Sequence, residues 1–221
     1  MMAAAPEVLF FDAAGTLIEL SRPVGHHYSN VAAAYGFLAS PERFDDAFRT
    51  AWKKMPLRPP CNGPRRDDDR PWWRDLVSKT FEHADLEPVG GKFEGCFADL
   101  YERFARPGVW TLFSEVEDVL VQLRRTYRLA VLSNFDGRLH RILADLDVAR
   151  HFERIIVSSE VGADKPHREI FEAALRAMHV SREKAMHVGD HPMLDWEAAE
   201  AIGISVFRLN RPTNSLLDLP L

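Results

Sequence analysis

The sequence has few cysteines and no long basic run, and both shortages exclude classes of protein. Its two cysteines, Cys61 and Cys96, are far apart and form no CxxC pair. Neither a disulfide framework nor a zinc site is expected, and both residues are interpreted as reduced thiols. Lysine and arginine number 28 against 33 aspartates and glutamates, for a formal net charge of −5, and no basic run is longer than the Arg65-Arg66 pair. Nucleic acid is therefore not an expected partner.

Long hydrophobic runs are also missing. The stretch that leads to Asp12 has no charged leader region and only a short apolar segment, so it predicts neither a signal peptide nor a membrane span. We therefore expect a cytoplasmic protein that does not act on membranes. Hydrophobic residues still make up 46% of the 221 residues, which suffices for one α/β domain and a smaller second domain.

Short apolar runs separated by helix-like stretches predict a doubly wound parallel sheet of the Rossmann-like α/β class. Uninterrupted apolar runs are typical of strands that are buried on both faces, and their alternation with helices is typical of parallel sheets. The runs lie at residues 8–11, 129–132, 155–157, 185–188 and 204–207. Local signals predict two helix starts in this part of the chain, a capping box formed by Ser114 and Glu117 and a first helical position at Pro166.

Residues 20–107 contain no comparable strand run and predict an entirely helical insert. Its helices are expected at residues 41–55, 72–84 and 92–104, the first of them capped by Ser40. The core domain is therefore expected to comprise residues 1–19 and 108–221. The proline-rich segment 56–71, with its carboxylates at 67–69, is interpreted as a mobile, solvated loop.

Polar residues occur in four of the loops that follow predicted strands. The loops beyond the carboxyl ends of parallel strands converge on one crevice, so these residues are expected to lie close together. Ser133 and Asn134 can donate hydrogen bonds to a phosphoryl oxygen, and Lys165 near a helix start can bind an anion. Asp190 and Asp195 suit a hard cation with oxygen ligands, for which Mg²⁺ is the natural candidate.

These loops together resemble the four signature motifs of the haloacid dehalogenase-like hydrolase superfamily. In order they read hhhDxxGT from Asp12, hhhSN, GxxKP and hGDxxxxD. The resemblance covers nearly the whole chain, because a helical insert directly after the first motif is similar to the type C1 cap of this superfamily. Within the insert and its entrance, residues 16–20, 22–25 and 71–74 resemble the rhythmically-expressed-gene-two branch of subfamily IA.

The resemblance implies a hydrolase in which Asp12 is the nucleophile and attacks phosphorus. Mg²⁺ would be held by Asp12, the backbone carbonyl of Ala14 and Asp190, with Asp195 supporting these ligands. A divalent ion and a lysine are needed because an anionic nucleophile must otherwise approach an anionic phosphate against charge repulsion.

The same resemblance assigns the binding of the substrate. Ser133, Asn134 and Lys165 would hold the transferred phosphoryl group, and Lys165 would also act in catalysis. The expected partner is a small phosphorylated molecule. The sequence indicates neither its identity nor the oligomeric state of the protein.

The chain departs from the family pattern at Ala14. Family phosphatases normally carry a second aspartate two residues after the nucleophile, where it protonates the leaving oxygen and later activates water. Loss of a positioned acid/base typically removes about 10²–10⁴ in rate. We therefore expect a slow or specialised phosphoryl hydrolase whose leaving group is intrinsically good.

Several alternatives stay open. The chain could be a catalytically impaired binding protein, or a haloacid dehalogenase, whose halide leaving group needs no proton. A third alternative is a C–P hydrolase like phosphonoacetaldehyde hydrolase, for which Lys53 or Lys54 in the insert would form the imine. His26 or His27 could replace the missing acid; otherwise they are interpreted as linker surface.

Overall fold

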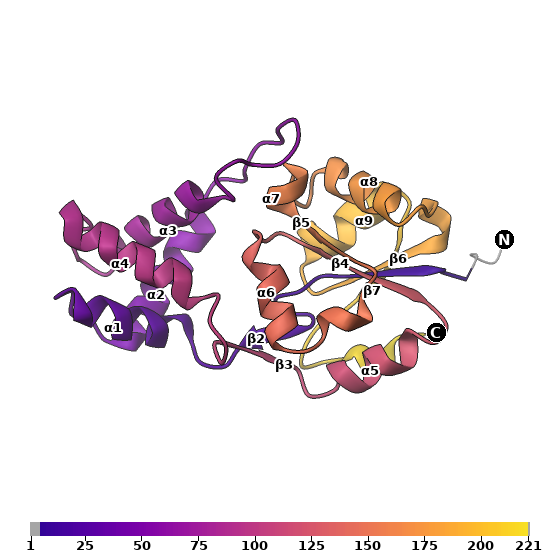
Figure 1. Cartoon of the computed structure of the whole chain (residues 1–221), viewed down its shortest axis with the longest axis horizontal. Helices are drawn as coiled ribbons and strands as arrows, with labels where there is room; N and C mark the ends of the chain where they lie inside the picture. The colour runs from indigo at the N-terminus through magenta and orange to yellow at the C-terminus, as the bar shows by residue number, and fades with distance from the viewer. Residues whose placement is uncertain (1–4, 221) are drawn as a thin grey trace. The chain divides into compact units, whose positions relative to one another are not determined.

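The computed structural model describes residues 5–220, which form two compact units (Figure 1). The core unit comprises the described residues up to Glu19, Arg58–Asp68 and the residues from Thr111 onward. The helical unit comprises Leu20–Leu57 and Asp69–Trp110. No helix among the described residues is both long and apolar enough to cross a membrane.

A parallel sheet of five strands forms the centre of the core unit, in the order β5-β4-β1-β6-β7. Phe11 of β1 is paired with Val131 of β4 on one side and with Val188 of β6 on the other, and all four residues of β1 are fully buried. The doubly wound parallel sheet is therefore confirmed. The strands are β1 (Val8–Phe11), β4 (Arg128–Ser133), β5 (Arg154–Val157), β6 (Ala185–Gly189) and β7 (Ser205–Arg208).

Helices cover both faces of this sheet, as right-handed crossovers on either side of β1 require (Figure 1). One face carries α5 (Val116–Leu123) and α6 (Arg138–Asp145), and the other carries α8 (Arg168–Ala177) and α9 (Ala198–Ala201). On the second face Phe10 and Leu132 share one buried cluster with Phe171. Short helices complete the unit at α7 (Ser158–Val161), η1 (Ala149–His151), η2 (Arg182–Lys184), η3 (Pro192–Glu197) and η4 (Leu216–Asp218).

The helical unit is built on an aromatic core. Phe81 is fully buried and contacts Phe44 and Phe93, with ring centroids 5.4 Å apart in both pairs. Its helices are α1 (Val24–Ala34), α2 (Pro41–Lys54), α3 (Arg70–His83) and α4 (Gly90–Arg103). The sequence patterns did not indicate α1. They also missed β2 (Ile18–Leu20) and β3 (Trp110–Leu112), which pair as a two-stranded sheet where the chain enters and leaves this unit.

Two of the expected helix starts in the core unit are wrong. Helix α5 begins at Val116 after Glu115, without a side-chain cap, and Glu115 instead accepts a hydrogen bond from Arg211 at 2.5 Å. Helix α8 begins at Arg168, so Pro166 precedes the helix and does not occupy its first position. At the start of α5 a contact with a distant residue takes the place of the local cap.

Residues Arg58–Asp68, which we call the strap, correct the expectation of a mobile, solvated loop. The strap belongs to the core unit, and its Asp68 carboxylate accepts a hydrogen bond from the backbone N–H of Gly137 at 2.9 Å. Ser159 also donates its hydroxyl to Asp68, at 2.6 Å. The Asp68 carboxylate is therefore bonded to groups elsewhere in the core unit, and such contacts fix a segment that lacks hydrophobic periodicity.

Candidate active site

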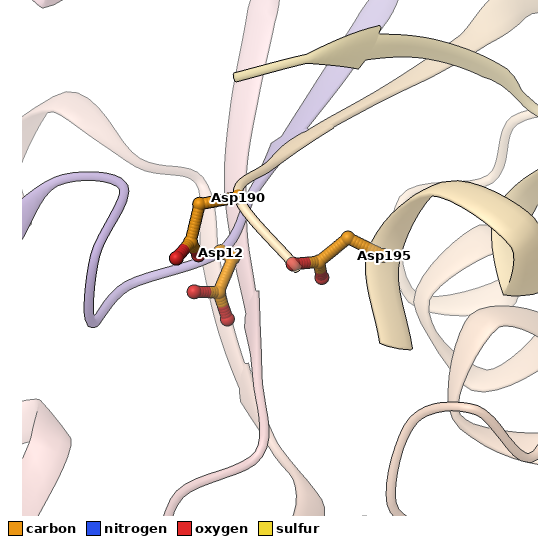
Figure 2. A group of neighbouring side chains, drawn as sticks. All are labelled: Asp12, Asp190 and Asp195. Carbon is orange, nitrogen blue, oxygen red and sulfur yellow. The ribbon is translucent and has the colours of Figure 1, made fainter. Parts of the chain in front are cut away.

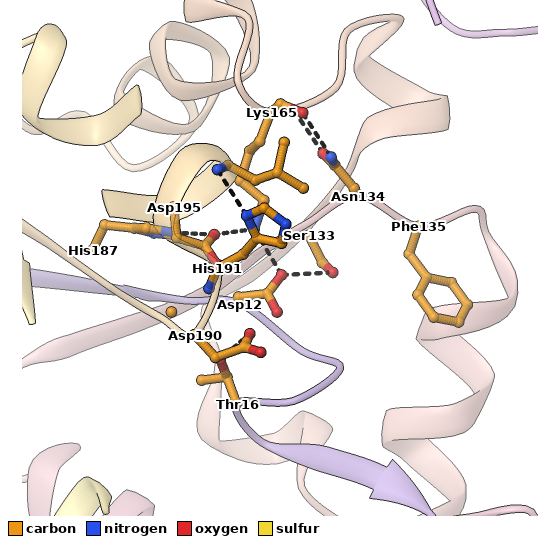
Figure 3. Close-up of polar contacts among 12 residues, drawn as sticks. Asp12, Thr16, Ser133, Asn134, Phe135, Lys165, His187, Asp190, His191 and Asp195 are labelled. Atoms are coloured by element: carbon orange, nitrogen blue, oxygen red, sulfur yellow. Dashed lines mark hydrogen bonds and ion pairs between the residues drawn. The ribbon is translucent and has the colours of Figure 1, made fainter. Parts of the chain in front are cut away.

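Asp12 lies immediately after β1 and is held by two donors from neighbouring elements (Figure 3). The Nζ of Lys165 is 2.7 Å from Asp12 Oδ1, and the hydroxyl of Ser133 donates to the same oxygen at 3.1 Å. Asp12 is 7% exposed. Because β4 is paired with β1, Ser133 at the end of β4 is brought to Asp12 across 121 residues of sequence.

Three carboxylates gather at this point (Figure 2). Asp12, Asp190 and Asp195 each offer one oxygen atom, and these atoms lie within 4.8 Å of one another. Lys165 supplies one ammonium against the three carboxylates, so the formal charge of the four side chains is +1 − 3 = −2. Hard oxygen donors with a residual charge of −2 fit a divalent cation such as Mg²⁺.

The pKa values of the three carboxylates differ. Burial raises the pKa of Asp12 from 3.8 to about 6, because Lys165 only partly offsets the desolvation and the other two carboxylates add repulsion. Burial and the charge of Asp195 also raise the pKa of Asp190. Asp195 is buried too, yet Lys165 and His187 hold its pKa well below the usual range. Asp12 and Asp190 are therefore the carboxylates for which the positive charge of Lys165 does not outweigh the cost of burial.

Lys165 is almost fully buried, with 2% of its surface exposed. Its Nζ bridges Asp12 Oδ1 at 2.7 Å and Asp195 Oδ1 at 2.6 Å. Burial lowers the pKa of this ammonium, but the two carboxylates outweigh that effect and raise the pKa above its ordinary value. The lysine therefore stays charged.

Asn134 holds the main chain of Lys165. Its Oδ1 accepts from the Lys165 backbone N–H at 2.6 Å, and its Nδ2 donates to the Lys165 carbonyl at 2.8 Å (Figure 3). This use of the side chain differs from the expected contact with phosphate. In the structure Asn134 positions Lys165.

Ala14 lies on the same turn as Asp12 and is exposed. Among the described residues no hydrogen bond is formed by its carbonyl oxygen, although neighbouring Ala13 accepts three. The carbonyl is therefore available as an oxygen ligand. The methyl side chain can neither donate nor accept a proton, so the structure contains no acid at this position.

Three further residues support this group, and the sequence patterns singled out only Thr16, as the last residue of the first motif. His187 is fully buried in β6, and its Nε2 lies 2.8 Å from Asp195 Oδ1. Thr16 donates its hydroxyl to Asp190 at 3.4 Å, and Arg211 donates to the Thr16 carbonyl at 3.0 Å. His187 interrupts an apolar strand run, which is a signal that could have marked it. No local signal marks Arg211.

Two glycines make room for the carboxylates. A Cβ on Gly15 would lie 2.4 Å from Asp190 Oδ2, and the φ of +91° at Gly15 also disfavours other residues. A Cβ on Gly189 would lie 2.3 Å from the Cγ of Asp195. Any side chain at these two positions would displace the carboxylates.

The side chains of His191 and His27 have contacts that do not involve the carboxylate group. His191 is exposed, and its Nδ1 accepts from the backbone N–H of Leu194 at 3.2 Å. His27 lies in α1 of the helical unit, is 2% exposed and packs edge-on against Phe104 with centroids 5.5 Å apart. The interpretation of His27 as linker surface is therefore wrong.

Comparison with known proteins places this geometry in a family. The family model of haloacid dehalogenase-like hydrolases matches residues 6–203. The mouse protein named haloacid dehalogenase-like hydrolase domain-containing protein 3 is 36% identical over 202 residues, which is 90% of this chain and 80% of the mouse protein. The Drosophila melanogaster rhythmically expressed gene 2 protein is 27% identical over 209 residues, covering 89% of this chain and 80% of the fly protein.

The fold agrees with these matches. A hydrolase of Bacillus subtilis described as a putative HAD-hydrolase, YfnB, superposes with a TM-score of 0.70 at 16% identity, over 96% of this chain and 92% of that one. The chain therefore belongs to the haloacid dehalogenase-like hydrolase family, on the branch of the rhythmically expressed gene 2 protein.

Proposed function

We propose that this chain hydrolyses phosphorylated small molecules in the cytoplasm through an aspartyl-phosphate intermediate at Asp12, with Mg²⁺ as cofactor. The observation that carries the proposal is the surroundings of Asp12. Its carboxylate is held by Lys165 and Ser133. It belongs to a group of side chains with a formal charge of −2, and a divalent ion would balance that charge.

The metal would be held by the Asp12 carboxylate, the Ala14 carbonyl and the Asp190 carboxylate. All three are hard oxygen donors, and the Bacillus subtilis hydrolase of the same fold was solved bound to magnesium. When bound, Mg²⁺ supplies the positive charge that lets a phosphate approach an anionic nucleophile. Asp195 is already engaged by Lys165, His187 and the His191 N–H, so its role is to support this arrangement.

The remaining steps belong to side chains of the chain itself. Asp12 attacks phosphorus and the bond to the leaving group breaks, while the Lys165 ammonium and the Ser133 hydroxyl hold the phosphoryl oxygens. Water then hydrolyses the aspartyl phosphate. Because Ala14 cannot deliver a proton, the leaving group departs as an anion, and aryl or acyl phosphates are the expected substrate class.

The test is hydrolysis of p-nitrophenyl phosphate and acetyl phosphate by the purified protein with Mg²⁺. Asp12→Asn should abolish turnover because it removes the nucleophile. A matched control is Asp118→Asn, since Asp118 is exposed on α5 and makes no hydrogen bond or ion pair among the described residues. This variant should keep the wild-type rate.

A binding protein is the second candidate, favoured by the alanine at position 14. If Asp12→Asn and the wild type show equal residual rates but both bind inorganic phosphate, the chain binds anions without turnover. Halide release from 2-haloacids and borohydride trapping with an aldehyde substrate test the dehalogenase and imine alternatives in the same preparations.

A further inference from the structure

Two arginines of the strap converge on the residue that precedes Lys165. The Nε of Arg58 donates to Asp164 Oδ2 at 2.7 Å, and Arg65 donates to both Asp164 oxygens at 3.2 and 3.4 Å. The three side chains are 15%, 10% and 4% exposed respectively. Asp164 is thus a buried carboxylate whose two oxygens are both taken by cations from the strap.

The strap also packs main chain against main chain on the loop that leads to Lys165. The backbone N–H of Cys61 donates to the carbonyl of Gly162 at 2.8 Å, and the backbone N–H of Arg65 donates to the carbonyl of Ser159 at 2.7 Å. A Cβ on Gly162 would lie 2.1 Å from the Gly63 carbonyl oxygen. This loop therefore has no room for any residue but glycine while the strap is docked.

The segment that ends at Lys165 is consequently anchored from two sides. Asn134 holds the main chain of Lys165 itself, and the strap holds Asp164 and Gly162. Without the arginines, Asp164 would be a buried carboxylate with no counter-charge, which must turn to water or compete for another cation. Lys165 is the next residue in the chain. A movement of Asp164 would therefore disturb the contacts of the Lys165 ammonium with Asp12 and Asp195.

We propose that Arg58 and Arg65 are positioning residues for Lys165, so that a segment from the middle of the insert completes the phosphate-binding loop of the core unit. The inference rests on the proposed function for its consequence in catalysis, but not for its consequence in anion binding. Neither arginine touches the substrate; both act through Asp164. Loss of the pair should weaken the hold of Lys165 on a phosphate oxygen.

The test compares Arg58→Gln/Arg65→Gln with the wild type in the presence of Mg²⁺. Calorimetry measures the affinity for inorganic phosphate, and p-nitrophenyl phosphate gives kcat and KM, at a temperature well below the unfolding transition of each variant. Loss of residues that support a site typically costs about 10–100-fold in affinity or activity, and we expect losses of that size in phosphate affinity and kcat. Arg66→Gln is the control, because Arg66 is an exposed arginine of the same strap with no hydrogen bond or ion pair among the described residues.

Two further variants separate positioning from general stabilisation. In a Lys165→Met background the two glutamine substitutions should change phosphate affinity no further, because their effect passes through the ammonium. Arg58→Lys/Arg65→Lys keeps both positive charges and should restore most of the affinity; it also provides the comparison if the glutamine variant does not fold. The proposal is overturned if phosphate affinity stays at the wild-type value, or if the loss is as large without Lys165.

The outcomes also distinguish this inference from the proposed function. If turnover proves independent of Asp12 while phosphate affinity falls in the strap variant, the proposed function fails and the positioning role stands. If turnover depends on Asp12 but phosphate affinity and kcat are unchanged in the strap variant, only the positioning role fails.

Discussion

In the proposed mechanism, position 14 decides whether a proton can reach the leaving group. Ala14 is exposed beside a buried carboxylate whose pKa is raised to about 6, and no described side chain at this position can act as an acid. Ser133 and Lys165, which the proposal assigns to the phosphoryl group, both contact the Asp12 carboxylate. The limit on turnover is therefore expected to lie in one side chain.

Ala14→Asp should raise kcat because it restores a proton donor next to the nucleophile. Positioned acids contribute about 10²–10⁴ in rate, and the gain should be larger for an alkyl phosphate than for p-nitrophenyl phosphate, since the alkoxide leaves poorly without a proton. The measurement is kcat for both substrates with Mg²⁺. Ala14→Asn matches the size of the new side chain without an acidic proton, and an equal gain in that variant would contradict the explanation.

Single residues were predictable from the sequence where their position after a strand marks them. Asp12 and Asp190 follow the ends of β1 and β6, and Ser133 is the last residue of β4. Strand ends are visible as the ends of apolar runs. Arg211 and Thr16, by contrast, are 195 residues apart. Thr16 belongs to the first motif, but only the folded chain shows that Arg211 meets it, so no spacing rule could have found Arg211.

Helix starts were predictable where the cap is local. Ser40 accepts a hydrogen bond from the N–H of Arg43 at 3.2 Å, as its place before Pro41 indicated. Helix α6 shows why other starts were not predictable. Its N-cap Gly137 has no side chain, and the carboxylate that accepts its N–H comes from Asp68, 69 residues earlier. The local Asp136 accepts the next N–H, that of Arg138, at 3.1 Å. The contribution of the distant Asp68 leaves no mark in the sequence around the helix.

The strap was unpredictable for a related reason. Its prolines and charges lack the periodicity that marks helices and strands, so composition alone indicated a solvated loop. The contacts that order it are ion pairs with Asp164 and backbone hydrogen bonds to Gly162 and Ser159. Such contacts depend on the arrangement of α7 and its neighbours, which hydrophobic patterning does not describe.

Helix α1 contains a histidine that should make the helical unit sensitive to acid. Burial, with the nearby charges of Arg103 and His26, lowers the pKa of His27 from 6.5 to about 4. Neither ring nitrogen makes a hydrogen bond that compensates. Below pH 6.5 His27 is protonated in the unfolded chain, whereas in the folded chain it stays neutral until the pH approaches 4. The stabilisation is therefore complete above pH 6.5 and is lost as the pH falls toward 4.

His27→Leu should remove this sensitivity. Between about pH 7.5 and about pH 4.5 the wild type should lose up to about 3 kcal/mol more unfolding free energy than the variant, from the size of the pKa shift. Urea unfolding at the two pH values, followed by tryptophan fluorescence, measures the difference. A variant whose stability falls with pH as steeply as that of the wild type would show that other groups cause the acid response.

At the scale of the whole molecule, the candidate active site lies entirely in the core unit, although the insert interrupts the sequence of that unit. The core unit is assembled from three segments, and every residue of the carboxylate group and its supports belongs to it. The fold class and the meeting of the four motif loops followed from strand alternation. The assignment of Arg58–Asp68 to the core unit did not.

Because the carboxylate group lies in the core unit, metal binding should stabilise that unit. A ligand that binds only the folded state stabilises it by RT ln(1 + [L]/Kd), about 2.7 kcal/mol at one hundred times the dissociation constant. Mg²⁺ should therefore raise the unfolding free energy of the core unit. Asp190→Asn should lose this increment, because it removes a ligand from a group with formal charge −2.

Phe81→Ala is the variant that separates the two units. Phe81 is fully buried in the core of the helical unit, and its truncation should cost about 3–5 kcal/mol there. Four of the five tryptophans also lie in the helical unit, with Trp196 in the core unit, so fluorescence follows mainly the helical unit and calorimetry follows both. Phe81→Ala should shift the fluorescence transition strongly and keep the Mg²⁺ increment measured by calorimetry.

Two outcomes would contradict these predictions. If Mg²⁺ stabilises Asp190→Asn as much as the wild type, the metal binds outside the carboxylate group. If Phe81→Ala loses the increment, the metal site depends on the helical unit.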